Sequence, residues 1–147
     1  MSPQKKKATT KKARPSRKRP ETLRLRSVEP SLTVNDLLRS LAWYRDVLGF
    51  TEDERWEHDG KLAGVSVTAG TVTINLAQDD WARGADRKKG EGFRLYLNTV
   101  QDVDEIATSI KSRGGMLDSE PKDMPWGARV FQLADPDGFK LTISSIA

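Results

Sequence analysis

Residues Pro125–Ile143 read PWGARVFQLADPDGFKLTI, and this stretch decides the fold. Two apolar runs flank Asp135-Pro136-Asp137-Gly138, whose acidic residues, proline and glycine are typical of a tight turn. The pattern predicts two strands, Arg129–Leu133 and Lys140–Ser145, joined as a hairpin at the end of the chain.

Upstream of this hairpin the sequence contains an internal repeat. Three landmarks recur at one offset of 66 residues: Val34 and Val100, Asp36 and Asp102, Gly49 and Gly115. A constant offset over several landmarks indicates a duplicated supersecondary unit. We therefore expect two similar modules in one domain.

Each module is predicted to be βαβββ. An extended segment (Leu23–Thr33 or Phe93–Thr99) precedes an aspartate, Asp36 or Asp102, suited to cap a helix. Apolar residues at helical spacing follow, and Gly49 or Gly114-Gly115 ends the helix. Three strands come next: Phe50–Trp56, Leu62–Thr68 and Thr71–Ala77 in module one, and Met116–Glu120, Arg129–Leu133 and Lys140–Ser145 in module two.

The predicted organisation is a disordered basic tail (1–22) and one domain (23–147). Within the domain, module one spans 23–78, a linker spans 79–90 and module two spans 91–147. The fold class is α+β, with two tandem βαβββ modules forming a curved mixed sheet, an open ligand cup and helices outside. The concave face of such a sheet is the natural place for a ligand.

Charge is distributed very unevenly along the chain. Residues 1–19 hold nine basic and no acidic residues, so the other 16 of the 25 basic residues face all 21 acidic ones. The formal charge of +4 therefore combines a tail of +9 with a body of −5. Such a tail cannot bury enough surface to offset its ordering entropy. We expect residues 5–19 to bind nucleic acid weakly and without sequence preference, or to act only as a solubilising tail.

The absence of cysteine excludes a disulfide framework and thiolate chemistry. No apolar run approaches the length that spans a bilayer, so no membrane association is expected. A cytoplasmic location is the expectation that fits these features.

With these features, the chain resembles the vicinal oxygen chelate superfamily, which includes glyoxalase I, extradiol dioxygenases and bleomycin-resistance proteins. Residues 31–50 (SLTVNDLLRSLAWYRDVLGF) are similar to its first strand-helix unit, and residues 135–143 (DPDGFKLTI) to its closing turn and strand. The resemblance covers about residues 25–143. It implies paired βαβββ modules, as the repeat does.

The resemblance also implies positions for a divalent metal, held by His and Glu side chains in the superfamily's enzymes. These positions fall on Glu29, on Leu95 (or Arg94 after a one-residue slip) and on Thr142. Only Glu29 is a useful ligand, and we interpret it as a strand-end surface acid in preference to a ligand-facing residue. The single histidine, His58, lies in a predicted turn. Since such a site needs three or more side-chain ligands, we expect no metal and no other cofactor.

Without a metal, the resemblance favours binding over catalysis, as in bleomycin-resistance-like members, which sequester a cationic drug as dimers. The segment Pro125–Arg129 is similar to the one before their closing hairpin. We expect a homodimer that binds a small hydrophobic or cationic molecule by stacking and charge. The predicted ligand-binding residues are Trp126, Arg129, Phe93, Arg94, Trp56 and Asn75.

Alternatives remain open at this level. Arg129 has the alternative of pairing internally with a carboxylate such as Asp135 or Asp137. Two other functions are also possible interpretations of the sequence. One is a metal-dependent lyase or dioxygenase whose metal site is displaced, and the other is a nucleic-acid-associated protein that acts through its tail.

Overall fold

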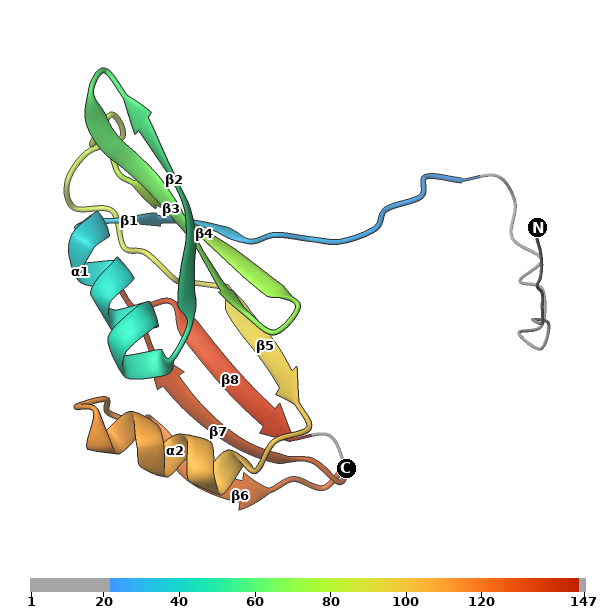
Figure 1. Ribbon diagram of the computed structural model, residues 1–147. Helices are drawn as coiled ribbons and strands as arrows, with labels where there is room; N and C mark the ends of the chain where they lie inside the picture. Colours follow the sequence, from blue (N-terminus) through green and yellow to red (C-terminus); the bar gives the residue numbers. More distant parts are fainter. Residues whose placement is uncertain (1–21, 146–147) are drawn as a thin grey trace, which may run out of the picture.

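The computed structural model describes residues 22–145, which form two βαβββ units joined by a linker (Figure 1). The first unit contains β1 (Ser31–Val34), α1 (Leu37–Ala42), the π-helical turn η2 (Trp43–Leu48), β2 (Thr51–His58), β3 (Lys61–Ala69) and β4 (Val72–Gln78). The second contains β5 (Arg94–Thr99), α2 (Val103–Ser112), β6 (Ser119–Asp123), β7 (Arg129–Ala134) and β8 (Lys140–Ser145). Apart from Thr22, the predicted tail lies outside the described residues.

The two units have the same sheet topology, which confirms the duplicated α+β fold. One mixed four-stranded sheet has the order β1-β4-β3-β2 and the other β5-β8-β7-β6. In each, the first strand runs parallel to the last strand of its unit, and the remaining pairs are antiparallel. The extended segment predicted from Leu23 is a strand only from Ser31 onward.

Both predicted helix caps are confirmed. The carboxylate of Asp36 accepts a hydrogen bond from the amide of Arg39 at 3.2 Å. The carboxylate of Asp102 accepts from the amides of Asp104, at 2.8 Å, and Glu105, at 3.3 Å. Each aspartate thus satisfies backbone donors that the first helical turn leaves free.

Helices of this chain within residues 22–145 are too short and polar to cross a membrane.

The repeated glycine has different roles in the two units. Gly49 ends η2 with φ +103°, as predicted, whereas in the second unit the left-handed residue is Gly114, with φ +93°. A Cβ on Gly115 would overlap the side chain of Ile110 and lie 2.8 Å from Cγ1 of Val47. Gly115 therefore allows the end of α2 to approach η2 closely.

This close approach also explains a shift in strand boundaries. Strand β6 begins at Ser119 rather than at the predicted Met116. The chain must first pass the packed end of α2, and pairing starts when the amide of Asp118 donates to the carbonyl of Gln132 at 2.7 Å. The β7–β8 hairpin agrees with prediction to within one residue.

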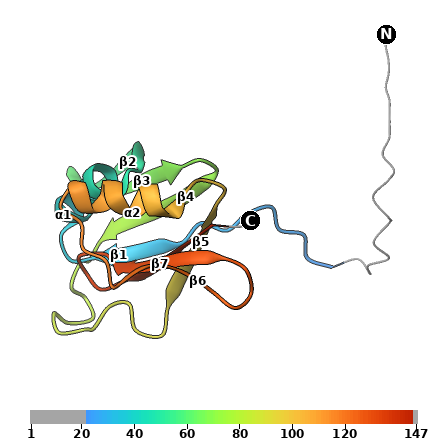
Figure 2. The same ribbon diagram turned by 90° about the horizontal axis from the view of Figure 1, so that it is seen from below.

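One hydrophobic core unites the two units. The helices lie together on one side of the molecule (Figure 2), and η2 contacts α2. Tyr44 of η2, Ile110 of α2 and Phe131 of β7 are fully buried in this core. Because side chains alternate along a strand, the residues between the core positions lie on the opposite, open face of each sheet.

Candidate functional site

The Asp-Pro-Asp-Gly turn joins the two units through buried carboxylates. The side chain of Asp137 is fully buried and accepts from the amide of Asn35 at 2.9 Å and from Nη2 of Arg39 at 2.7 Å. Asp135 accepts from its own turn, at the amides of Asp137 and Phe139, both at 2.9 Å. The Asp135-Pro136-Asp137-Gly138 turn therefore has a structural role, because it holds the two units together.

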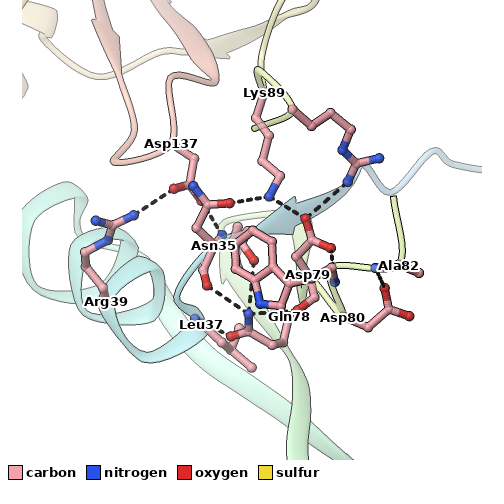
Figure 3. Close-up of polar contacts among 12 residues, drawn as sticks. Asn35, Leu37, Arg39, Gln78, Asp79, Asp80, Ala82, Lys89 and Asp137 are labelled. Carbon is pink, nitrogen blue, oxygen red and sulfur yellow. Dashed lines mark hydrogen bonds and ion pairs between the residues drawn. The ribbon is translucent and has the colours of Figure 1, made fainter. Parts of the chain in front are cut away.

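The linker enters the same polar cluster. Figure 3 shows Lys89 reaching both Asn35 and Asp79, while Gln78 reaches the backbone near Asn35. The Lys89–Asp79 ion pair is 2.6 Å long, and both side chains are nearly completely buried. Hydrogen bonds from Lys89 and from the Trp81 amide hold the pKa of Asp79 below its usual range. This cluster fixes the linker against both units.

The open face of the first sheet carries two predicted ligand-binding residues, Asn75 and Trp56. Asn75 Nδ2 donates to Glu29 Oε1 at 3.3 Å, so Glu29 lies beside this face. The Trp56 ring lies against Gly64, where any Cβ would overlap it. Trp56 remains 40% exposed, which leaves part of its ring available for stacking.

The open face of the second sheet carries Arg94. Leu141 and Ile143 of β8 enter the core, so Thr142 between them faces the other way. Arg94 Nη1 donates to Thr142 Oγ1 at 3.1 Å. Of the two alternatives for the second-module position, the structure selects Arg94, because Leu95 packs against the core. Phe93, next to Arg94, packs its ring edge-to-face on Phe139 at 6.3 Å.

Arg129 lies on the helix side of the second sheet. Its Nε and Nη2 donate to the carboxylate of Asp104 on α2 at 2.7 and 3.0 Å, and Nη1 donates to Asp123 at 3.1 Å. An internal pairing was one predicted alternative, but the carboxylates are these two and not Asp135 or Asp137. The hydrogen bonds from Arg129 hold the pKa of Asp104 below its usual range.

Trp126 and His58 stand apart from both open faces. Trp126 lies in the β6–β7 turn and is 64% exposed. His58 ends β2 beside its turn, with Nε2 3.4 Å from Asp59 Oδ2 and both side chains in solvent. The structure therefore brings together Phe93 with Arg94, and Asn75 with Glu29. It does not bring these residues together with Trp126 or Arg129.

Two residues of the open faces were missed from the sequence. Lys140 is the cross-strand partner of Arg94, and Tyr96 is the partner of Thr142. Tyr96 is 47% exposed. Period-two alternation outward from Arg94 would have indicated Tyr96, whereas Lys140 required the register of two parallel strands far apart in sequence.

The residues at the metal positions do not fit a divalent cation. Arg94 places a permanent positive charge there, and its hydrogen bond occupies the Thr142 hydroxyl. Across residues 22–145, His, Cys, Asp and Glu side chains form no group of three or more that could hold a metal ion.

A cleft of about 770 Å³ is lined by residues of both units. Its walls include the end of η2, the β3–β4 turn, the end of β5 and the first turns of α2. Its lining includes the apolar side chains of Leu48, Phe50 and Ile106 and the charged side chains of Glu105 and Arg113. Its lining includes none of the predicted ligand-binding residues.

The fold is a pair of βαβββ units, each with one sheet face in the common core and one open face. The model of the Glyoxalase/Bleomycin resistance protein/Dioxygenase superfamily matches residues 24–143. The chain belongs to this superfamily, which confirms the resemblance seen in its sequence.

Individual relatives are distant. A probable lactoylglutathione lyase of Synechocystis sp. is 29% identical over 118 residues, 76% of this chain and 88% of the relative. Glutathione transferase FosA of Serratia marcescens is 28% identical over 115 residues, 77% of this chain and 75% of that protein. Among solved structures, TioX from Micromonospora sp. ML1 has a TM-score of 0.66 at 19% identity, covering 80% of this chain and 95% of TioX. This likeness shows the fold alone.

Proposed function

We propose that this protein binds a small amphipathic molecule through side chains of the open sheet faces, without a metal and without turnover. The observation that carries the proposal is the Arg94–Thr142 hydrogen bond at a position where an enzyme of this superfamily would need a metal ligand. A guanidinium there recognises ligand oxygen atoms directly.

The apolar part of the ligand has aromatic partners on both faces. Trp56 and Tyr96 are each nearly half exposed, and aromatic rings in that state offer stacking surface. The acidic strand β2 offers less attraction for a cation than its composition indicates, because Glu52 pairs with Arg55 and Arg45. We therefore give stacking and hydrogen bonding more weight than a positive charge on the ligand.

A second copy of the chain completes the binding cup in this proposal. Each sheet has one face in the common core and one open face, and the open faces carry half-exposed aromatic side chains. Pairing of two chains would bury that apolar surface. Light scattering of the purified protein should give twice the mass of one chain. A monomer at micromolar concentration would contradict this part of the proposal.

Catalysis is the second candidate, and the curated relatives favour it. Several are named lactoylglutathione lyase, and another is named glutathione transferase FosA. For this chain, such an activity would need metal-ligating side chains in addition to those found on the open faces.

Metal content and turnover distinguish the two candidates. The protein is purified without chelator, analysed for divalent metals, and assayed with methylglyoxal and glutathione with added Zn²⁺, Ni²⁺ or Mn²⁺. We expect substoichiometric metal and no turnover above a Glu29→Gln variant. One tightly bound metal ion per chain, or turnover that this substitution abolishes, would overturn the proposal. Mass spectrometry of the native protein then identifies any co-purified ligand.

A further inference from the structure

A depression of about 540 Å³ lies where the linker meets the beginnings of β5 and β8. Its lining consists of Lys89, Gly90, Glu91, Gly92, Phe93, Arg94, Gly138 and Lys140. A Cβ on Gly90 would overlap the carbonyl group of Gly138, so only glycine allows the linker to pack on the β7–β8 turn here. Lys89 anchors the same segment through Asp79. The depression is therefore preformed.

Two cations of this depression lie side by side with little internal compensation. Arg94 and Lys140 are cross-strand partners in the parallel β5–β8 pair, on the open face of the sheet. Among residues 22–145, Arg94 has a hydrogen bond to the neutral Thr142 hydroxyl and no ion pair with a carboxylate. Lys140 forms an ion pair with Asp118 at 3.4 Å, and both side chains of that pair are nearly half exposed to solvent. Arg94 therefore retains its attraction for an anion, and Lys140 retains part of its own.

The other charged groups nearby limit how much negative charge the depression accepts. Lys89 is neutralised by its short ion pair with Asp79, so it adds no net charge. Glu91 is part of the lining and opposes an anion. A monoanion suits this balance better than a dianion, because each additional negative charge is repelled by Glu91.

An aromatic side chain adjoins the cationic pair. Phe93 is 42% exposed, and its packing on the buried Phe139 holds the ring in place. A fixed, partly exposed ring beside an unpaired guanidinium matches a ligand with an apolar ring close to an oxyanion.

We propose that this depression binds the carboxylate of an aromatic monocarboxylic acid, with Arg94 and Lys140 holding the carboxylate and Phe93 contacting the ring. This rests on the proposed binding function and names its ligand class as an organic monoanion. The carboxylate would accept charge-assisted hydrogen bonds from the guanidinium, which is a geometry that lysine alone does not provide.

The test is a titration of the full chain with phenylacetate, in which NMR monitors the chemical shifts of the backbone amides of residues 90–94 and 138–140. Benzylammonium serves as a ligand of the same size and opposite charge, and inorganic phosphate as an anion without a ring. We expect saturable shifts with phenylacetate, weaker binding of phosphate, and none of benzylammonium. Following these particular amides separates the depression from anion binding by the basic tail.

Four variants assign the binding to side chains. Arg94→Gln should weaken phenylacetate binding roughly tenfold or more, and Arg94→Lys, which keeps the charge, should weaken it less. Glu91→Gln should strengthen it, because a repulsive charge is removed. Lys122→Gln on β6 removes a cation outside the depression and should leave binding unchanged. The melting temperature of each variant verifies that it is folded.

Equal binding by the wild type and Arg94→Gln, or equal binding of benzylammonium, would overturn the proposal. Tighter binding of phosphate than of phenylacetate would overturn the assignment to an aromatic carboxylate. Neither result depends on metal content or turnover. Failure of this subsite is thus distinguishable from failure of the proposed function.

Discussion

The phenol of Tyr44 donates a 2.8 Å hydrogen bond to Oδ2 of Asp135, and both side chains are buried where the two modules meet. Tyr44 belongs to η2 of the first module and Asp135 to the β7–β8 turn of the second. Burial raises the pKa of the Tyr44 phenol, and the negative charge of Asp135 raises it further. Burial also raises the pKa of the Asp135 carboxyl, although three hydrogen bonds partly oppose this.

Tyr44→Phe should lower the free energy of unfolding by about 1–3 kcal/mol, because a buried carboxylate oxygen loses its donor. Denaturant unfolding near neutral pH measures this loss. Tyr96→Phe, at a half-exposed position on the open face, is the matched control and should change stability by less than about 0.5 kcal/mol.

The same pair predicts a dependence on alkaline pH. Because the folded-state pKa of Tyr44 is raised, its contribution is fully present below the ordinary tyrosine value near 10 and is lost as pH rises from there toward the folded pKa. The difference in stability between wild type and Tyr44→Phe should therefore shrink above about pH 10. A difference that stays constant to pH 11 would contradict the buried, protonated phenol.

Asp137→Ala should destabilise the fold by about 2–3 kcal/mol. The substitution leaves the Asn35 amide without its acceptor and separates Arg39 from its partner. Asp59→Ala removes a carboxylate from an exposed turn and should have an effect within about 0.5 kcal/mol. Similar effects in the two variants would show that Asp137 does not join the modules.

Gly115→Ala should cost about 1–3 kcal/mol, because the new methyl group enters the packed contact between Val47 and Ile110. Ser109→Ala, on the exposed surface of α2, tests for any general effect of alanine in this region. Thermal unfolding measures the loss of stability in both variants, and the loss should be larger in Gly115→Ala. A stable Gly115→Ala would mean that the ends of α2 and η2 are less tightly packed than in this structure.

Arg129→Gln should leave ligand binding unchanged, because Arg129 pairs with Asp104 and Asp123 on the helix side. The pKa of Asp104 should rise toward its usual range when the guanidinium is lost, and NMR titration follows this. With its folded-state pKa depressed, Asp104 contributes stability above its unfolded pKa, and that contribution is lost as pH falls through the folded value. Loss of ligand binding in Arg129→Gln would show that Arg129 belongs to the ligand-binding site.

The basic tail gives a prediction that is independent of the fold. A nucleic-acid role for residues 5–19 predicts that the full-length protein binds duplex DNA weakly, with the logarithm of affinity falling by roughly 0.9 per released phosphate counterion for each unit of log salt, whereas a solubilising tail predicts no binding. A protein starting at Thr22 should not bind. Equal binding by both proteins in a gel shift would reject a role for the tail.

Local patterns predicted most of the fold. The caps at Asp36 and Asp102, the end at Gly49 and the β7–β8 hairpin follow from interactions within a few residues. The boundary of β6 did not follow, because the position of Gly115 against Val47 depends on a contact between two modules. The π-helical form of η2 was likewise missed, since apolar spacing does not distinguish it from an α-helix.

The sequence by itself determined the duplicated modules, through landmarks repeated at one offset, and the capped helices and closing turn, through short-range patterns. Only the tertiary structure decided which side of each strand is open. Alternation divides a strand into two faces but does not tell which face another element covers. Arg129 thus lies against α2, whereas Arg94 lies beside Lys140, a neighbour 46 residues away that the parallel pairing of β5 and β8 brings into register.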